Sequence, residues 1–321
     1  MRKFFKVLLF IVLGIAVLVG IAAAYVSMRS LPKHTPEKIS VAVEYTPQRV
    51  ENGTKLASML CRSCHLNDET GKFTGRELTE APQFGKIFAK NITKDPNAGI
   101  GNWTDGELIY FLRTGIRPDG VYIPPYMPKL AHISDEDMLS IVSFLRSDNR
   151  WVQPDPTEMQ ESKTSFLTNF LVTIGAVKPF PYPKTPIPGP DTTNPVKHGE
   201  YISLYQLECF SCHSQDFAKN DYFTPSKSPG FFAGGNKMYR LDGSEIYSLN
   251  ITSDPNGIGS WSEDDFVKAV KFGQVPNGHP TLRDPMQPYS NLTDKEAKAI
   301  YAYLRSVPKN NNKIERKFQE Q

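Results

Sequence analysis

The chain has 321 residues, of which 39% are hydrophobic and 22% are charged, and its formal net charge is +3. These proportions are typical of a folded globular protein and exclude a disordered chain. The first thirty residues hold four basic residues and no acidic one, which leaves −1 for the rest, so the concentrated basic surface of a nucleic-acid-binding protein is excluded as well.

Residues 1–30 are predicted to form a membrane anchor. Three basic residues precede twenty uncharged residues, 7–26, that are rich in Leu, Ile, Val and Ala. A helix of that length, at ~1.5 Å per residue, spans a hydrocarbon core of ~30 Å. Basic residues ahead of it predict a cytoplasmic N-terminus and an exported remainder. The alternative is a cleaved signal peptide, because residues 22–24 are small, but the length of the apolar run favours an uncleaved anchor.

This pattern predicts a single-pass protein of the bacterial inner membrane, with the remaining chain on the periplasmic side. The four cysteines do not decide the compartment, since all of them fall in two Cys-x-x-Cys pairs and none is left for a structural disulfide.

A repeat of long period follows the anchor. Asn-Ile-Thr-Lys-Asp-Pro at 91–96 returns as Asn-Ile-Thr-Ser-Asp-Pro at 250–255, Gly-Ile-Gly-Asn-Trp at 99–103 returns as Gly-Ile-Gly-Ser-Trp at 257–261, and Phe-Leu-Arg-Ser at 144–147 returns as Tyr-Leu-Arg-Ser at 303–306. Each copy begins with its own Cys-x-x-Cys-His motif. We interpret the two copies as one duplicated domain, over residues 45–150 and 195–308.

Helix-start signals occupy matching places in the two copies. They begin at Thr104 and Ser134 in the first copy, and at Ser262 and Thr293 in the second. Apolar residues follow at helical spacing. Strand-like alternation is scarce and loops rich in glycine and proline are abundant, so the predicted fold class is all-α.

Residues 151–194, between the two copies, are predicted to be a proline-rich linker. Proline fixes φ and removes a backbone donor, so this stretch should be extended rather than helical. It contains an apolar patch at 166–174 that is too short to span a bilayer. We expect the patch to pack on the two domains, and the alternative is contact with a partner or with the membrane surface. Residues 309–321 form a polar tail.

The two Cys-x-x-Cys-His motifs consist of Cys61, Cys64 and His65, and of Cys209, Cys212 and His213. This spacing is the attachment signature of c-type haem, because two such thiols add to the two vinyl groups of one porphyrin and the histidine binds the iron. A zinc site needs four grouped ligands, and a thioredoxin-like pair needs a βαβ context. Neither pattern is present, so we predict two covalently bound haem c groups.

The sixth ligands of the two irons are predicted to be Met127 and Met286. Each lies in a loop flanked by proline, and each follows its repeated asparagine by 36 residues. The separations from the proximal histidines are 62 and 73 residues, so the second copy holds eleven more. We expect that insertion at about 235–244. Methionine ordinarily fills cores, but equivalent positions in rigid loops favour iron ligation.

Four repeated residues are predicted to line the haem pockets: Ile100, Trp103, Ile258 and Trp261. The isoleucines are expected on the porphyrin face. The tryptophans are expected beside the haem, with ordinary core packing as the alternative.

Four further polar residues lie near these motifs. Asn91 and Asn250 begin Asn-x-Thr, which is a glycosylation signal, but their recurrence fits a structural hydrogen bond at the haem edge better. His132 and His279 are fallback iron ligands at positions that are not equivalent in the two copies.

Each copy resembles a class I cytochrome c domain, with a helix before Cys-x-x-Cys-His, a methionine loop and a closing helix. The repeated segments 91–103 and 250–261 resemble the multi-haem cytochrome subunits of membrane-bound alcohol, gluconate and aldehyde dehydrogenases. The resemblance covers nearly everything after residue 45, although those subunits typically carry three haem motifs and this chain has two. It implies two tandem class I cytochrome c domains and electron passage from a dehydrogenase towards a quinone pool or a terminal oxidase.

The predicted function is therefore electron transfer without a substrate reaction of the chain's own. Ligation by histidine and methionine raises the reduction potential of a haem and leaves no open coordination position. The expected partners are redox proteins, namely a dehydrogenase, an oxidase or a quinol-linked complex, and no nucleic acid.

Two enzymes with two haem domains are the alternatives. A di-haem peroxidase needs one haem that opens for peroxide, usually with ligands that differ between the domains, and the matched methionine loops argue against it. A thiosulfate dehydrogenase-like enzyme usually has an unusual ligand at its active haem. All four cysteines are assigned to haem attachment, so a cysteine ligand is excluded.

Overall fold

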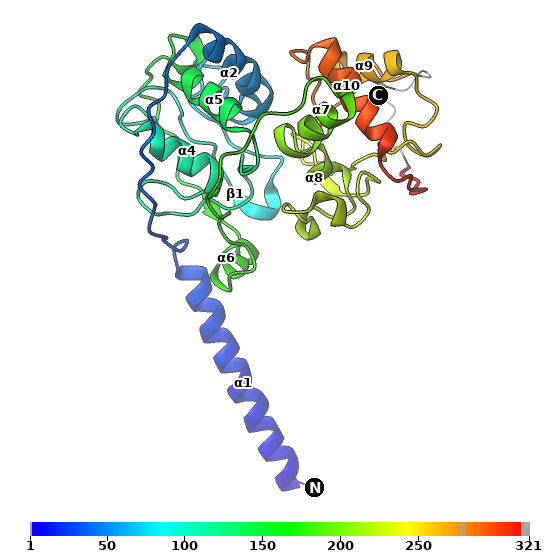
Figure 1. The fold of residues 1–321 in the computed structure, drawn as a ribbon. Helices are drawn as coiled ribbons and strands as arrows, with labels where there is room; N and C mark the ends of the chain where they lie inside the picture. Colours follow the sequence, from blue (N-terminus) through cyan, green and yellow to red (C-terminus); the bar gives the residue numbers. More distant parts are fainter. Residues whose placement is uncertain (1, 277, 279, 316–321) are drawn as a thin grey trace.

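The computed structural model describes residues 2–276, 278 and 280–315, and helices dominate it (Figure 1). The α-helices are α1 (Arg2–Met28), α2 (Pro47–Leu60), α3 (Arg62–His65), α4 (Asp105–Thr114), α5 (Asp135–Arg146), α6 (Phe166–Thr173), α7 (Pro195–Tyr201), α8 (Cys209–His213), α9 (Glu263–Phe272) and α10 (Asp294–Ser306). Short 3-10 turns are η1 (Pro82–Phe84), η2 (Arg150–Val152), η4 (Phe217–Lys219) and η5 (Pro225–Lys227), and η3 (Ile202–Gln206) is a π-helix.

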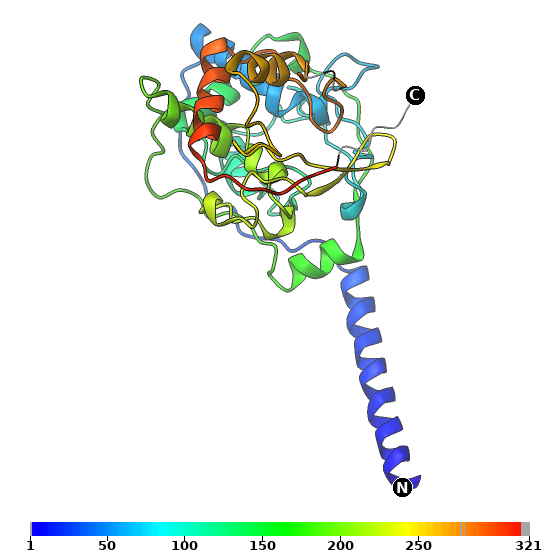
Figure 2. The same cartoon turned by 90° about the vertical axis from the view of Figure 1, so that its right-hand side faces the viewer.

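Helix α1 projects away from the rest of the molecule (Figures 1 and 2). Its apolar side chains are exposed along almost its whole length, and Val26 near its C-terminal end is its one buried residue. Among the described residues, α1 alone is long and apolar enough to cross a membrane. The structure is therefore compatible with the predicted anchor.

The first half of the molecule, residues 45–150, is built on the crossing of α2 and α5. Thr46 starts α2 by accepting a hydrogen bond from the Arg49 amide at 3.2 Å, with a proline at the first helical position. The two helices meet at Gly53, where an added Cβ atom would lie 1.9 Å from the backbone oxygen of Ser140. Glycine at this position is therefore what allows the two backbones to come so close.

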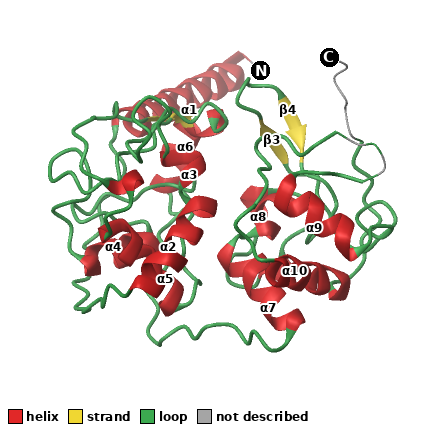
Figure 3. Cartoon of the chain, turned by 90° about the horizontal axis from the view of Figure 1, so that it is seen from above, coloured by secondary structure: helices red, strands yellow, loops and turns green. Residues whose placement is uncertain are grey.

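The second half, residues 195–308, repeats this crossing with α7 and α10. A Cβ atom added at Gly199 would lie 1.9 Å from the backbone oxygen of Ala299. Ala299 occupies the same place in α10 as Ser140 does in α5, counted from the repeated Phe-Leu-Arg-Ser or Tyr-Leu-Arg-Ser segment. Figure 3 shows the two helix groups side by side, with α2, α4 and α5 in one and α7, α9 and α10 in the other.

The predicted helix starts are confirmed. Thr104, Ser134, Ser262 and Thr293 each accept a hydrogen bond from the backbone amide three residues further on. The helices α4 and α9 also end alike, at glycines with φ of 81° and 74°. These left-handed positions close a helix at low cost only when they hold glycine.

The structure adds two short antiparallel strand pairs that the sequence did not predict. Strand β1 (Gly85–Lys86) pairs with β2 (Lys163–Thr164), and β3 (Lys237–Tyr239) pairs with β4 (Glu245–Tyr247). The first pair ties the linker back to the first half. The proline-rich stretch that follows Gly175 is non-helical up to α7, as predicted, but the apolar patch ahead of it forms the helix α6.

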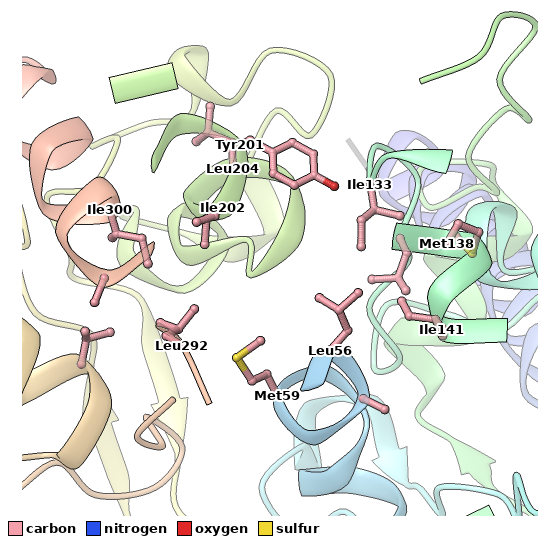
Figure 4. Packing of buried hydrophobic residues seen from close by; sticks show 14 of the residues in the cluster. Leu56, Met59, Ile133, Met138, Ile141, Tyr201, Ile202, Leu204, Leu292 and Ile300 are labelled. Atoms are coloured by element: carbon pink, nitrogen blue, oxygen red, sulfur yellow. The ribbon is translucent and has the colours of Figure 1, made fainter. Parts of the chain in front are cut away.

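One apolar cluster continues from the first half into the second (Figure 4). Leu56, Met59, Ile133, Met138 and Ile141 contribute from the first half, and Tyr201, Ile202, Leu204, Leu292 and Ile300 from the second. Polar contacts join the same faces: the Tyr201 hydroxyl donates to Asp137 at 2.6 Å, and Lys55 pairs with Glu296 at 2.5 Å. The two halves therefore share a continuous, packed interface.

Candidate haem-binding sites

The first Cys-x-x-Cys-His motif occupies the end of α2 and the short helix α3. Its histidine, His65, is buried, and its ring Nδ1 lies 2.8 Å from the backbone oxygen of Lys90. Because a carbonyl only accepts, the ring proton belongs on Nδ1, and Nε2 keeps its lone pair. Burial lowers the pKa of His65, so the imidazole stays neutral, as a metal ligand must be.

The second motif has the same arrangement. In α8 the Nδ1 of His213 lies 2.7 Å from the backbone oxygen of Leu249, and burial again lowers the pKa of this histidine. Lys90 and Leu249 directly precede the repeated asparagines. Such a partner fixes the tautomer and orientation of a ligating histidine. Neither carbonyl group was predicted from the sequence, although the repeated segments start one residue after each of them.

A cavity of about 1640 Å³ brings the predicted residues of the first half together. Cys61, Cys64, His65, Ile100, Trp103 and Met127 all line it. Ligand pockets commonly measure ~300–1,000 Å³, so a haem-sized group has ample room. The same cavity reaches the second motif, where Glu208, Ser211 and Cys212 form part of its wall.

The chemistry of the donor groups fits covalent haem attachment. Burial raises the pKa of the Cys61 and Cys209 thiols to about 12, and it raises the pKa of Cys64 and Cys212 as well. Among the described residues no group of three or more Cys, His, Asp and Glu side chains is placed to hold a metal ion, so neither motif has the four grouped ligands that a zinc site needs. Each motif therefore presents two thiols and one neutral imidazole, which is the set that a c-type haem requires.

The two methionines lie in loops that share one backbone hydrogen bond, although the second loop alone has a cis peptide bond, at Asp284–Pro285. The amide of Met127 donates to the Pro124 oxygen at 3.3 Å, and that of Met286 donates to the Arg283 oxygen at 3.0 Å. Lys129, two residues after Met127, is buried and donates to the backbone oxygens of Pro124 and Met127. The equivalent residue of the second loop is a proline, so only the first loop contains an ammonium group.

Lys129 has an oppositely charged neighbour, Glu208, in the second half, and no sequence pattern predicts this proximity. Burial lowers the pKa of Lys129 to about 7 and raises that of Glu208 to about 8, while each group's charge opposes the shift of the other. Glu208 directly precedes Cys209 and has a left-handed backbone, with φ of 47°. Two ionisable groups, the buried Lys129 and the partly buried Glu208, therefore lie where the halves meet, one beside each predicted haem site.

The other predicted pocket residues fall into two groups. Ile100 and Trp103 line the cavity, and Ile258 is buried and Trp261 half-buried at the equivalent places. In both halves the tryptophan amide donates to the backbone oxygen of that isoleucine, at 3.2 and 3.1 Å. The loop geometry is therefore repeated together with the residues.

The repeated asparagines bind backbone, which agrees with a structural role and specifies its partner. The Nδ2 group of Asn91 donates to the oxygens of Asp155 and Thr157, both at 2.9 Å. That of Asn250 donates to the oxygens of Asn310 and Asn312, at 2.7 and 3.0 Å. Both asparagines are only 4% exposed. Each one holds the chain that follows its own closing helix.

The position predicted for the insertion was wrong. The amides of Ile92 and Ile251 donate to the oxygens of Phe73 and Phe232, which identifies the two phenylalanines as equivalent. Phe73 follows its histidine by eight residues and Phe232 by nineteen. The eleven additional residues therefore lie within 214–231, ahead of the predicted 235–244, because the segment from Phe232 to Asn250 matches the first half in length.

One fallback ligand is found away from the cavity wall. The ring of His132 packs edge-on against Phe180, Tyr205 and Phe223, with centroid separations of 5.7–6.1 Å. The other, His279, lies outside the described residues.

Comparison with known proteins agrees with this geometry. Residues 203–308 match the family model described as Cytochrome c. Residues 203–308 are a cytochrome c domain. Such a domain carries haem c and transfers electrons, and its match includes the second Cys-x-x-Cys-His motif, the second methionine loop and the closing helix α10.

Proteins that are similar to about three quarters of the chain include several cytochromes. It is 29% identical over 267 residues to the fructose dehydrogenase cytochrome subunit of Gluconobacter japonicus, covering 77% of this chain and 50% of that protein. It is 30% identical over 262 residues to the cytochrome c subunit of alcohol dehydrogenase (quinone) of Gluconobacter oxydans (strain 621H), covering 77% and 52%. The chain thus spans about half the length of these relatives. A diheme cytochrome c-type protein of Cereibacter sphaeroides is 26% identical over 259 residues, covering 77% and 82%.

The cytochrome c domain is completed by residues on both sides of the matched segment. Helix α7, which crosses α10 at Gly199, lies before residue 203. The carbonyl groups that bind Asn250 lie after residue 308.

Proposed function

We propose that this chain is a membrane-anchored electron carrier with two haem c groups, held in two tandem class I cytochrome c domains at residues 45–150 and 195–308. The observation that carries the proposal is the repeated histidine geometry. In both halves an imidazole, buried at His65 and partly buried at His213, follows two partly buried thiols and donates Nδ1–H to the carbonyl group that precedes the repeated asparagine. This repeated hydrogen bond supports two haem sites.

Each proposed site is assigned the same set of residues. Cys61 and Cys64 form the thioethers of the first haem, with His65 and Met127 as axial ligands of its iron. Cys209 and Cys212, with His213 and Met286, do so for the second. Ile100, Trp103, Ile258 and Trp261 form pocket walls. The cavity that both motifs border supports electron exchange between the two sites within one chain.

A haem bound at these residues supplies one-electron exchange between ferric and ferrous iron. The protein's part is to hold the histidine neutral and oriented, to keep water from the iron by burial, and to raise the reduction potential through the thioether of methionine. With both axial positions taken by side chains, the sites are suited to electron transfer rather than to binding a substrate.

The partners of this carrier are also inferred. Relatives named as cytochrome subunits of fructose and alcohol dehydrogenases support a periplasmic dehydrogenase as electron donor. Helix α1 supports attachment to the bacterial inner membrane, with both halves on the periplasmic side. The acceptor is then an oxidase or a quinol-linked complex. We propose no catalysis by the chain itself.

Haem content under denaturing conditions tests the proposal, because thioether bonds survive unfolding. The wild-type chain should retain two haems, and changing Cys61 and Cys64 to Ala, or Cys209 and Cys212 to Ala, should leave one. The Ser63→Ala and Ser211→Ala variants, which alter the same motifs without removing a thiol, are the matched controls and should retain two. Complete loss of haem on acid–acetone extraction would contradict the proposal.

Peroxide turnover separates the carrier from a di-haem peroxidase. The reduced wild-type protein should consume hydrogen peroxide no faster than free haem does, since neither iron offers an open position. Robust turnover would overturn the carrier assignment while leaving the haem count intact.

A further inference from the structure

Helix α6 has one face against the protein and one face left open. Thr168 and Val172 are buried on the inner face, and Val172 packs in a cluster with Tyr110 and Tyr122. On the outer face Phe166, Leu167, Phe170 and Ile174 are 49%, 58%, 39% and 57% exposed. The rings of Phe166 and Phe170 stack on each other at 6.1 Å. The helix thus presents a compact apolar surface.

This surface is held rigidly rather than on a loose linker. The Ser165 side chain caps α6 by accepting from the Thr168 amide at 3.2 Å, and it donates to the Gln83 oxygen at 2.9 Å. The Ser165 amide donates to the Phe84 oxygen at 2.7 Å. The pairing of β2 with β1 fixes the two residues ahead of it. The open face is therefore a fixed part of the first half.

The position of α6 relative to α1 is the second observation. The two helices contact each other, and Val26, at the end of the apolar run, is the α1 residue that is buried. Figure 1 shows α6 beside the end of α1 from which the chain enters the body. Tyr25 stacks with Arg29 there, at 5.6 Å. Tyrosine and arginine at the end of an apolar helix are typical of a membrane–water interface.

From this juxtaposition we propose that α6 lies in the outer interface of the membrane and inserts Phe166, Leu167, Phe170 and Ile174 among the lipid chains. The proposal rests on the anchor role proposed for α1. If the uncharged run 7–26 spans a core of ~30 Å, its last residue lies at the core boundary. A helix that touches α1 at this level has its open apolar face at the depth where interfacial helices bind.

The charges around α6 fit a bacterial membrane surface. Lys163 precedes the helix and Lys178 follows it, and both are exposed. Lys86, opposite Lys163 in the strand pair, is also more than half exposed, and it pairs loosely with Glu77 at 3.8 Å. Juxtamembrane lysines of this kind attract anionic headgroups. One acidic residue of the same linker, Glu161, is exposed but pairs with Lys90 at 2.7 Å. The first half is then attached to the membrane at two points, which fixes its orientation.

Photo-crosslinking of the full chain tests the proposal. Benzoylphenylalanine replaces Phe166 or Phe170 in protein reconstituted into vesicles of phosphatidylethanolamine and phosphatidylglycerol, and adducts are identified by mass spectrometry. Phe272, an aromatic residue on α9 that is 54% exposed, is the matched control position. We expect lipid adducts at 166 and 170 at least tenfold above those at 272. A Leu167→Asp change should reduce the adduct at 170 several-fold, whereas Leu241→Asp should not.

Three other results of the crosslinking experiment would contradict the α6 proposal. A chain that floats with the vesicles but gives no lipid excess at 166 and 170 overturns the α6 proposal and leaves the anchor in place. A chain that does not float overturns the anchor and the α6 proposal together, with the haem count unaffected. Crosslinks from these positions to a second copy of the chain would identify a dimer face and also overturn it.

Discussion

The two halves cross their first and last helices in the same way, yet they connect that crossing to the haem motif differently. Gly53 lies eight residues before Cys61, and Gly199 lies ten residues before Cys209. In the first half α2 continues without interruption to Leu60. In the second half the two additional residues are absorbed by the π-helix η3 and by the left-handed turn at Glu208. The helix crossing and the motif are thus kept, and the segment between them varies.

The two methionine loops also keep some features in common and differ in others. Both loops have the same hydrogen bond at the methionine amide and the same distance from the repeated asparagine, but Lys129 is buried behind the first loop and Pro288 takes its place in the second. The surroundings of the two proposed iron sites therefore differ while the proposed ligand sets agree. A pair of haems with unlike surroundings but like ligands is suited to two different reduction potentials.

The largest expected effect comes from the methionine ligands. Met127→His and Met286→His should each keep both haems attached, and each should lower the potential of one haem only, on the order of a few hundred millivolts. A change of ~59 mV is tenfold in a one-electron equilibrium. Electron flow through the chain should therefore fall at least a thousandfold. Redox titration of each variant measures the change in the potential of each haem.

The buried Met59, which no ligand assignment involves, provides the control for that series. Met59→Leu should leave both potentials at their wild-type values. If either histidine variant keeps both wild-type potentials, the methionine that it replaces is not a ligand and the two sites differ in kind.

The glycine crossings should respond next most strongly. Gly53→Ala and Gly199→Ala each place a Cβ atom 1.9 Å from a backbone oxygen, which cannot move without separating two helices. We expect each to lower the free energy of unfolding by about 3 kcal/mol or more. Thermal denaturation followed by circular dichroism measures the loss. Gly189→Ala, where an added Cβ atom meets nothing within 4 Å, should change stability little. A small loss of stability for only one of the two variants would show that the close helix contact does not stabilise the two halves equally.

The asparagine contacts are expected to contribute less. Asn91→Ala and Asn250→Ala each remove two hydrogen bonds to partly buried carbonyl groups, which costs about 1–3 kcal/mol in total. Asn250→Ala should also make the chain near Asn310 easier to cleave by a protease, whereas Asn91→Ala should expose the linker near Asp155 instead. Asn256→Ala removes an exposed contact to Asn311 and serves as the control. Cleavage at the same place in both variants would contradict the assignment of one segment to each half.

The smallest effect belongs to the ion pair between the halves. Burial alone would raise the pKa of Glu296, but its hydrogen bonds from Lys55 and Thr293 hold that pKa below the usual value of 4.5. A carboxyl group with a lowered folded-state pKa contributes stability above about pH 4.5 and loses it as the pH falls through the folded-state value. Both side chains are partly exposed, so the contribution is under ~1 kcal/mol.

Lys55→Met tests this pair without removing the carboxylate that caps α10. The variant should be slightly less stable at pH 7 and should lose less stability than wild type on acidification below about pH 4.5. Chemical denaturation at several pH values measures both. Lys298→Met, which removes an exposed pair within the second half, is the control. Equal pH profiles for wild type and Lys55→Met would exclude Glu296 as a contributor.

The features that the sequence predicted well are those that local residues determine. The helix starts at Thr104 and Ser262 depend on a cap and the three residues that follow it, and the structure confirms both. The duplication made equivalent places visible and suggested Met127 and Met286 together as ligands, and this assignment stays a prediction.

The features that it did not predict depend on contacts between distant segments. The carbonyl partners of His65 and His213 come from loops 25 and 36 residues away. The insertion was assigned to the wrong loop because the sequence does not show that Phe232 is equivalent to Phe73. The burial of Lys129 near Glu208, and the contact of α6 with α1, depend on how separate segments come together.

The places to which the two asparagines bind have a consequence for biogenesis. Asn91 holds the chain at Asp155 and Thr157, so every segment that completes the first half precedes the second Cys-x-x-Cys-His motif in the sequence. Asn250 holds the chain at Asn310 and Asn312. A chain that emerges from a translocation channel with its N-terminus first can close its first half before Cys209 has left the channel, since domains fold as units in the order of synthesis. The second half closes only once residue 312 is across. If the chain is exported and carries the two proposed haems, the first site can therefore be complete while the chain is still in transit, and the second only when the chain is almost released.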